Sequence, residues 1–183
     1  MNSITSRKKQ PEAVKAKLLQ TAEDLTYING WGNFSLNDVV AKSGISKGGL
    51  LHHFPTKNVL LDTLYDTLLE RFDARISGLM QHDSEPLGRF LRAYLQVMCQ
   101  VSDDPESRLP AVLRLALVAD AALKPKWQAW LDTKLSLIDG DAFSLMVRLA
   151  ADGLWLAGLT QDDILNLPGF QNSLEELDAM TRV

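Results

Sequence analysis

Fifteen residues at positions 43–57, SGISKGGLLHHFPTK, contain the residue types most capable of chemistry in this chain. His52 and His53 are adjacent, and Lys47 stands a few residues before them. Neighbouring side chains on a helix point about 100° apart, so the two histidines are poorly placed to share one metal ion. No Asp, Glu or Cys lies three or four residues from either histidine. The pattern predicts no metal site, and nucleic-acid recognition becomes the hypothesis to test.

The rest of the sequence has few of the residue patterns that are typical of an enzyme. It has no glycine-rich phosphate loop and no HExxH pair, and its single cysteine, Cys99, has no histidine in the same segment. The carboxylate pairs Asp103-Asp104 and Asp162-Asp163 stand at expected helix starts, where the helix dipole explains them. We expect no enzyme, no catalytic residue and no cofactor. A dimeric helical scaffold or signalling module without DNA binding remains the alternative function.

Charge is divided unevenly along the chain. Residues 1–57 hold eight Lys and Arg against four Asp and Glu, whereas residues 58–183 hold eleven against nineteen. A phosphate backbone responds to the charge within a Debye length of about 8 Å, so the net charge of −4 does not exclude a double-stranded DNA partner. Arg7, Lys8 and Lys9 form either an arm that contacts DNA or a solvated tail.

Apolar residues recur at helical spacing along almost the whole chain, and no segment alternates as a strand does. The sequence therefore predicts an all-α protein. A lone cysteine excludes an internal disulfide and favours a reduced, cytoplasmic setting. No stretch reaches the roughly twenty apolar residues of a membrane span, so no membrane partner is expected.

Three short helices are expected before a long one, over residues 11–29, 36–42, 47–53 and from 57 onward. A turn of three to four residues at Gly44 joins the second to the third, as in a helix-turn-helix. The residues expected to start these helices are Pro11, Ser35 with Asp38 in a capping box, Ser46 and Thr56.

Two glycines, Gly48 and Gly49, follow this turn inside the short third helix. Each costs a helix up to about 1 kcal/mol relative to alanine, so helix stability did not select them. A position without a side chain lets the backbone approach a DNA phosphate or base edge. The alternative explanation is that the glycines allow tight packing of the short helix on its neighbours, and this explanation fits Gly49 better than Gly48.

The same region resembles the DNA-binding signature of the TetR (tetracycline repressor) family over about residues 12–62. The matching segments are FSL at 34–36, VVA at 39–41, SGISKG at 43–48, Leu50, and HFPTK at 53–57. The family usually has an aromatic residue directly after the position of Leu50, and this chain has Leu51 there. The phosphate contact of a tyrosine hydroxyl is therefore in doubt, although His52 can supply a donor from the next position.

The resemblance implies about nine helices, with a helix-turn-helix domain over residues 1–57 and an effector-binding and dimerisation domain over residues 58–183. It implies a homodimeric repressor that leaves its operator when a small molecule binds. His53 and Phe54 would anchor the recognition helix. The DNA-binding residues we expect are Ser35, Ser46, Lys47, Gly48, Gly49, His52 and Lys57.

The C-terminal two thirds contain further helix starts at Pro86, Pro105 and Pro125 and an apolar segment over residues 141–158. That segment has no full polar face, so it needs two partners, its own domain and a second subunit. The last helix is expected to begin with a capping box formed by Ser173 and Glu176. The expected dimer interface is Leu145, Leu149, Gly153, Leu156, Ala157, Leu174 and Leu177.

A ligand pocket is expected where large and adaptable side chains gather on the middle helices and on the inner side of the 141–158 helix. An apolar or aromatic effector would fit it, with Arg114 or Arg148 as partner for an anionic group. Core packing is the alternative for each of its residues. The expected lining is Leu68, Phe72, Met98, Leu113, Leu117, Trp127, Trp130, Phe143, Met146 and Trp155.

Overall fold

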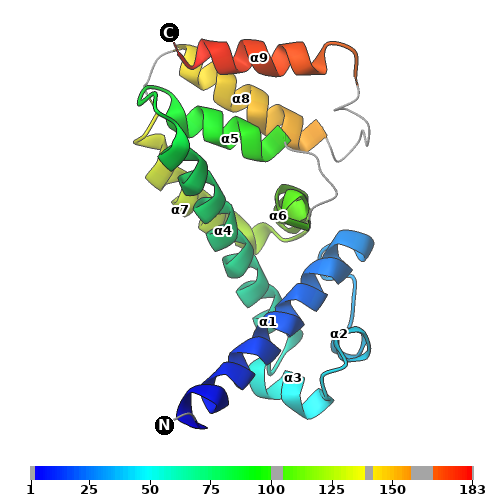
Figure 1. Ribbon diagram of the computed structural model, residues 1–183. Helices are drawn as coiled ribbons and strands as arrows, with labels where there is room; N and C mark the ends of the chain where they lie inside the picture. Colours follow the sequence, from blue (N-terminus) through cyan, green and yellow to red (C-terminus); the bar gives the residue numbers. More distant parts are fainter. Residues whose placement is uncertain (1–2, 100–104, 139–141, 158–166, 183) are drawn as a thin grey trace. The chain divides into compact units, whose positions relative to one another are not determined.

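The computed structural model describes residues 3–99, 105–138, 142–157 and 167–182, and its regular elements there are all helical (Figure 1). Nine α-helices and two short 3-10 helices lie in these ranges, which confirms the all-α prediction. In the same ranges no helix is both long and apolar enough to cross a bilayer. The carboxylate pairs at 103–104 and 162–163 lie outside the described residues, as do the side chains of the basic arm.

The chain forms two compact units, Met1–Leu68 and Leu69–Val183. The long helix α4 (Lys57–His82) begins in the first unit and ends in the second. The sequence analysis placed the domain boundary between residues 57 and 58, one residue into this helix. The two compact units divide later within α4, between Leu68 and Leu69.

The first unit is built from α1 (Ser3–Asn29), α2 (Leu36–Ser43), α3 (Lys47–His53) and the start of α4. Helix α1 contacts both α2 and α3, and α2 contacts α3 (Figure 1). The apolar side chains that these helices bury include Leu18, Ala22, Val39, Leu50, Phe54, Leu60 and Leu64. This small core holds the two helices of the expected DNA-reading motif in a fixed arrangement.

Helix α1 differs from expectation at both ends. It begins at Ser3 and contains Pro11 in its interior, so the expected start at Pro11 is wrong. Proline removes one backbone donor and marks where a helix can begin, but a helix can continue through it at the cost of that bond. At its other end, Ile28 lies in the last turn of α1 and is 67% exposed, although its helical spacing from Leu18 and Leu25 predicts a buried position.

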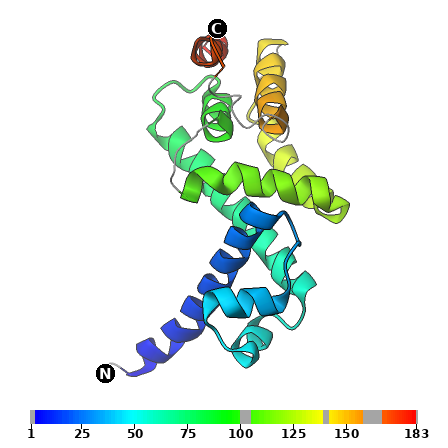
Figure 2. The same ribbon diagram turned by 90° about the vertical axis from the view of Figure 1, so that its right-hand side faces the viewer.

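The second unit contains the rest of α4 with α5 (Arg89–Cys99), α6 (Leu109–Ala119), α7 (Lys124–Leu135), α8 (Ala142–Ala157) and α9 (Phe170–Met180). Short 3-10 helices, Pro105–Arg108 and Ala121–Leu123, precede α6 and α7. Helix α5 is the centre of this unit, since it contacts both α8 and α9 and every side chain from Phe90 to Leu95 is buried (Figures 1 and 2).

Prolines mark the helix starts of the second unit only partly. Pro125 lies in the first turn of α7 as expected, but α5 begins three residues after Pro86. Helix α9 begins at Phe170 after Gly169 in the left-handed conformation, so the expected capping box at Ser173 and Glu176 is wrong. The Ser173 hydroxyl instead donates to the Gly169 carbonyl at 3.0 Å, one turn back within the helix.

Candidate functional site

The start of α2 is fixed by a complete capping box between Ser35 and Asp38. The Ser35 Oγ accepts from the Asp38 backbone N–H at 3.2 Å, and an Asp38 carboxylate oxygen accepts from the Ser35 N–H at 2.7 Å. These hydrogen bonds from Ser35 stabilise the carboxylate form and lower the pKa of Asp38. Gly44 closes the other end of α2 with φ of 69°, and its N–H donates to the Val40 carbonyl. The expected caps and turn are therefore confirmed.

The turn into α3 is held by two serine hydroxyls. The Ser43 Oγ accepts from the Ile45 N–H at 3.2 Å, and the Ser46 Oγ caps α3 by accepting from the Gly49 N–H at 3.1 Å. Ser43 is buried, and the sequence analysis gave it no role beyond the family match. The sequence did contain a signal for this role, because Ser43 stands directly before Gly44 and a serine hydroxyl can accept from a backbone N–H in a turn.

Gly48 and Gly49 have different surroundings. A Cβ added at Gly48 would meet nothing within 4 Å, so packing within the chain does not require a glycine there. A Cβ at Gly49 would lie 3.1 Å from Ile45 Cγ2 and 3.3 Å from the Ser46 Oγ, which is tighter than ordinary contact. The packing explanation therefore fits Gly49 and does not account for Gly48.

The outer face of α3 exposes Ser46, Lys47, Gly48, Leu51 and His52 together. The inner face buries Leu50 completely. The short segment that follows buries Phe54, so α3 is anchored on both sides of the histidine pair. His53 is half-buried, and its ring lies 6.3 Å from that of Phe54. Among the described residues, no group of His, Cys, Asp and Glu side chains is placed to hold a metal ion.

Lys57 makes contacts that the sequence analysis did not anticipate. Its Nζ donates a hydrogen bond to the Gly32 carbonyl and lies 5.6 Å from the centre of the Phe34 ring. The side chain is half-buried and ties the start of α4 to the loop between α1 and α2. Next to it, the Thr56 Oγ1 accepts from the Val59 N–H at 3.2 Å, as expected of a cap for α4.

The second unit contains a cluster of aromatic rings, which we call the aromatic cluster: Phe72, Tyr94, Trp127, Trp130 and Trp155. Ring centres lie 5.2 Å apart for Phe72 and Trp130, 5.0 Å for Trp127 and Trp130, and 5.2 Å for the stacked pair Trp127 and Trp155. Four of its five members belong to the expected pocket. The structure thus brings together side chains from α4, α7 and α8 that are far apart in sequence.

Hydrogen bonds fix the polar atoms of the aromatic cluster. Trp130 Nε1 donates to Asp73 at 2.7 Å, and Trp155 Nε1 donates to the Pro110 carbonyl at 2.7 Å. The Tyr94 hydroxyl donates to Asp152 at 2.6 Å, and burial together with this carboxylate raises the pKa of Tyr94. The rings of Tyr94, Trp130 and Trp155 are therefore each held in orientation by a hydrogen-bond partner on another helix.

Other residues of the expected pocket lie on α4, α5 and α6. Leu113 is fully buried, Met98 nearly so, and Leu117 is partly exposed on α6. Leu68 is fully buried on α4. The Arg114 guanidinium donates to the Trp155 carbonyl, and burial lowers its pKa.

Phe143 and Met146 are not on the inner side of α8, and this corrects the expected pocket. They are 49% and 47% exposed, because the inner side of α8 is formed by Ser144, Val147, Ala151 and Trp155 at helical spacing. The periodicity could not assign a side, since α8 is apolar on most of its surface. Both residues instead extend the outward apolar surface of the helix.

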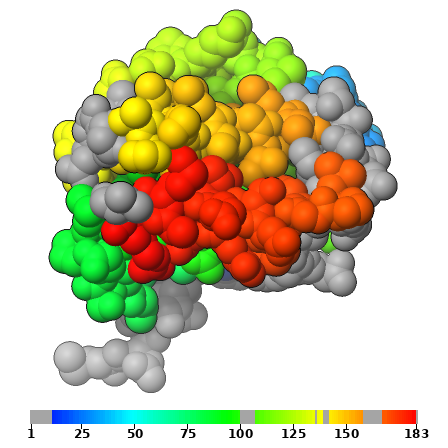
Figure 3. Space-filling view, turned by 90° about the horizontal axis from the view of Figure 1, so that it is seen from above, coloured from blue at the N-terminus to red at the C-terminus, as the bar shows by residue number. Residues whose placement is uncertain are grey.

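The outward side of α8 is the main exposed apolar surface among the described parts of the second unit. Beside Phe143 and Met146 it carries the expected interface residues Leu145, Leu149 and Leu156, each about half exposed. Gly153 is exposed as well, with no atom near the Cβ it lacks, and Ala157 is half-buried. Figure 3 shows α8 and α9 side by side on one face, and Leu174 and Leu177 of α9 are only partly buried.

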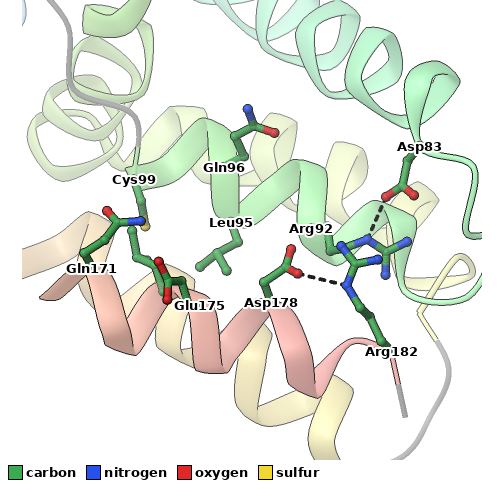
Figure 4. Close-up of a pocket in the computed structure, with 10 residues that line it drawn as sticks. Asp83, Arg92, Leu95, Gln96, Cys99, Gln171, Glu175, Asp178 and Arg182 are labelled. Atoms are coloured by element: carbon green, nitrogen blue, oxygen red, sulfur yellow. Dashed lines mark hydrogen bonds and ion pairs between the residues drawn. The ribbon is translucent and has the colours of Figure 1, made fainter. Parts of the chain in front are cut away.

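A cavity of about 540 Å³ between α5 and α9 was not anticipated (Figure 4). Its lining contains many polar side chains, with Arg92 and Cys99 from α5 on one side and Glu175 and Asp178 from α9 on the other. Burial raises the pKa of the Cys99 thiol to about 12. The sequence analysis gave Arg92 no role, because an arginine is rarely buried unless it is paired, and its partners could not be read from the sequence.

Comparison with known proteins gives two matching family models. The model described as "Bacterial regulatory proteins, tetR family" matches residues 18–64. The model described as "Tetracyclin repressor-like, C-terminal domain" matches residues 88–182, which is more than half of the chain. The two matches together cover the helix-turn-helix region and most of the second unit.

Individual relatives are similar over part or nearly all of the chain. The HTH-type transcriptional regulator TtgR of Pseudomonas putida is 29% identical over 107 residues, and the match covers 57% of this chain and half of TtgR. The HTH-type transcriptional repressor Rv3405c of Mycobacterium tuberculosis is 28% identical over 191 residues, covering 98% of this chain and 95% of the repressor. The crystal structure of SCO4454, a TetR-family regulator from Streptomyces coelicolor, has a TM-score of 0.67 at 19% identity and covers 100% of this chain and 96% of its own.

Proposed function

The chain belongs to the TetR family of bacterial transcriptional regulators, and we propose that it represses transcription by placing one copy of α3 from each subunit in the major groove of an operator. It is a DNA-binding regulator and not an enzyme, and the family assignment gives no support to a scaffold without DNA binding. The proposal that it represses is supported by its similarity to a named repressor.

The observation that carries the DNA-reading proposal is the exposed face of α3. Lys47 and Gly48 are both exposed, and Gly48 has open space where a Cβ would lie, so a phosphate or base edge can approach the backbone there without displacing any side chain. The exposed side chains of Ser46 and His52 add hydrogen-bond donors beside them. Gly49 lies close to Ile45 and Ser46 and allows the tight packing of the same turn. Ser35 is exposed at the start of α2, where its hydroxyl now donates to Asp38 at 2.8 Å and would turn to a phosphate.

Fluorescence anisotropy tests this interface with a labelled duplex from upstream of the protein's own gene and a random duplex of equal length. Lys47→Ala should weaken both complexes about equally and lower the slope of log K against log salt by about one. Lys57→Ala should lower the slope similarly and also cost roughly 1 kcal/mol of stability, because its bond to Gly32 is lost.

Lys124→Ala is the matched control for the DNA measurement, since Lys124 is an exposed lysine of the second unit. It should bind both duplexes as the wild type does. An unchanged salt slope in Lys47→Ala or Lys57→Ala would remove that lysine from the phosphate contacts. A wild-type protein that binds neither duplex at low salt would overturn the DNA-reading proposal itself.

We also propose that the outward side of α8, together with α9, forms the homodimer interface. Large apolar side chains are half exposed there, and Gly153 and Ala157 permit close approach of a second helix. In such a dimer the two copies of α3 must lie about one turn of DNA apart, about 34–36 Å.

A small apolar or aromatic effector is the proposed signal, bound at the aromatic cluster with Met98, Leu113 and Leu117. Helix α4 carries Phe72 of the cluster and also Lys57 at its first residue, so one continuous helix links the proposed effector site to the DNA-reading unit. An effector that binds better to one arrangement of α4 shifts the population between DNA-binding and released states.

A further inference from the structure

Arg92 is a buried cation, 6% exposed, on a helix of the apolar core, and its guanidinium donates several hydrogen bonds. Its Nε donates to Asp83 at 2.6 Å, and its Nη2 donates to the Glu85 carbonyl at 2.7 Å. Its Nη1 donates to the Leu87 carbonyl at 2.8 Å and to the Thr181 Oγ1 at 3.0 Å. A guanidinium presents several donors in one plane, so it can bond to groups on both sides at once.

These bonds join two segments that are far apart in sequence. Asp83, Glu85 and Leu87 belong to the turn between α4 and α5, whereas Thr181 directly follows α9. Figure 4 shows Arg92 between Asp83 on one side and the end of α9 on the other. One buried cation therefore bonds both to the α4–α5 turn and to the residue that follows α9.

Gly88 provides an independent observation at the same place. A Cβ there would lie 2.2 Å from the Thr181 backbone oxygen, and the residue has φ of 67°. The turn and the end of α9 therefore approach each other with no room for a side chain. Helix α9 itself buries no residue, and Thr181 at 4% exposed is the deepest point of this segment.

We propose that Arg92 is the positioning residue of α9, fixing its end on the α4–α5 turn and thereby completing the surface through which the protein dimerises. The second part rests on the proposed dimer interface of α8 and α9. Because α9 has only partly buried or exposed side chains, loss of the Arg92 bonds frees the helix while the aromatic cluster and α5 to α8 keep their packing.

The test compares Arg92→Gln with a matched control, Arg182→Gln. Arg182 also lies near the end of α9, but its partner is Asp178 and that ion pair is exposed. Hydrogen exchange measured by mass spectrometry should accelerate about tenfold or more over residues 170–182 and 83–88 in Arg92→Gln. In Arg182→Gln it should stay within about twofold of wild type, because exposed ion pairs contribute little. Exchange over α1 to α3 should be unchanged in both.

Two milder variants keep the proposal testable where Arg92→Gln does not fold. Thr181→Val removes only the hydroxyl acceptor, and Gly88→Ala inserts a Cβ at the close approach. Both variants should accelerate hydrogen exchange over residues 170–182. Gly169→Ala is the control, because Gly169 has a similar φ but open space where the Cβ would lie, and this variant should leave exchange over residues 83–88 unchanged. Wild-type exchange over residues 170–182 in Thr181→Val, Gly88→Ala and any folded Arg92→Gln would overturn the positioning role.

Sedimentation velocity over a dilution series separates the two parts of the proposal. We expect the dimer dissociation constant to rise about tenfold or more in Arg92→Gln and to stay unchanged in Arg182→Gln. A wild-type monomer would overturn the dimer proposal, and the exchange measurement would still decide the role of Arg92. Faster exchange of α9 with an unchanged dissociation constant would overturn the link between positioning and dimerisation.

Discussion

At Gly48 and Gly49, two identical neighbouring residues have different surroundings, and only the three-dimensional structure separates them. Sequence reasoning could state both explanations, since glycine is a poor helix residue wherever it stands. It could not weigh the space around each Cα, which depends on Ile45 and Ser46 at the turn. The same limit applies to Lys57, whose contacts with Gly32 and Phe34 involve residues more than twenty positions away.

Gly48→Ala should therefore separate folding from DNA binding. The free protein has open space for the new methyl group, and helix propensity should raise its stability by up to about 1 kcal/mol. DNA affinity should fall about tenfold or more, because the methyl group occupies the path of the DNA backbone or base edge. Thermal unfolding and anisotropy on the same samples measure the two effects.

Two matched variants accompany this measurement. Gly78→Ala on α4 also enters open space and should leave DNA affinity unchanged. Gly49→Ala should gain less stability than Gly48→Ala, because Ile45 and Ser46 must yield to its methyl group. A Gly48→Ala protein with wild-type affinity would mean that the backbone at this position does not approach DNA closely.

At the scale of elements, local signals predicted α2 and α3 better than α9. The caps of α2 and α3 join residues two or three positions apart, so the serine and glycine types already determine them. The start of α9 follows from Gly169 in a left-handed conformation and from packing against α8 and α5, and a serine four residues later misled the prediction. The two apolar sides of α8 were recognised, but their assignment needed the position of α5.

Gly153→Arg tests whether the outward side of α8 forms the dimer interface. The substitution enters empty space in the single chain, so the fold should be retained, but a long charged side chain would be buried in the proposed interface. The protein should sediment as a monomer or aggregate. Gly78→Arg places the same side chain in open space on α4 and should remain a dimer.

The outcome for Gly153→Arg that contradicts the proposal is a native dimer with the wild-type dissociation constant. That result would place the interface away from the outward side of α8. Circular dichroism on both variants distinguishes loss of the dimer from loss of the fold.

At the scale of the whole chain, the opposite charges of the two parts could be counted from the sequence, and they agree with a basic DNA-reading part and an acidic remainder. Most of the aromatic cluster was predicted too, since large apolar residues at helical spacing are driven into a core. The bonds of Arg92 were beyond sequence reasoning, because Thr181 lies 89 positions away and either residue alone reads as surface.

Effector binding should be visible in the fluorescence of the aromatic cluster. A titration panel of aromatic acids, fatty acids and cationic dyes should contain compounds that quench emission and release labelled DNA at the same concentration. The Trp31→Phe variant removes the tryptophan of the first unit, so its signal reports Trp127, Trp130 and Trp155 alone. Quenching without DNA release would indicate binding that is not coupled to the operator, and no response to any compound would argue against the effector site.

Cys99, the one cysteine of the chain, makes the protein well suited to site-specific labelling. Burial raises the pKa of its thiol to about 12, so little thiolate is present at neutral pH, and maleimides and methanethiosulfonates react through the thiolate. A second cysteine on an exposed position of α2, as in Ala41→Cys, would react far faster. Spin labels or dyes attached there would measure the distance between the α2 helices of two subunits, with and without DNA, while the native cysteine stays in place.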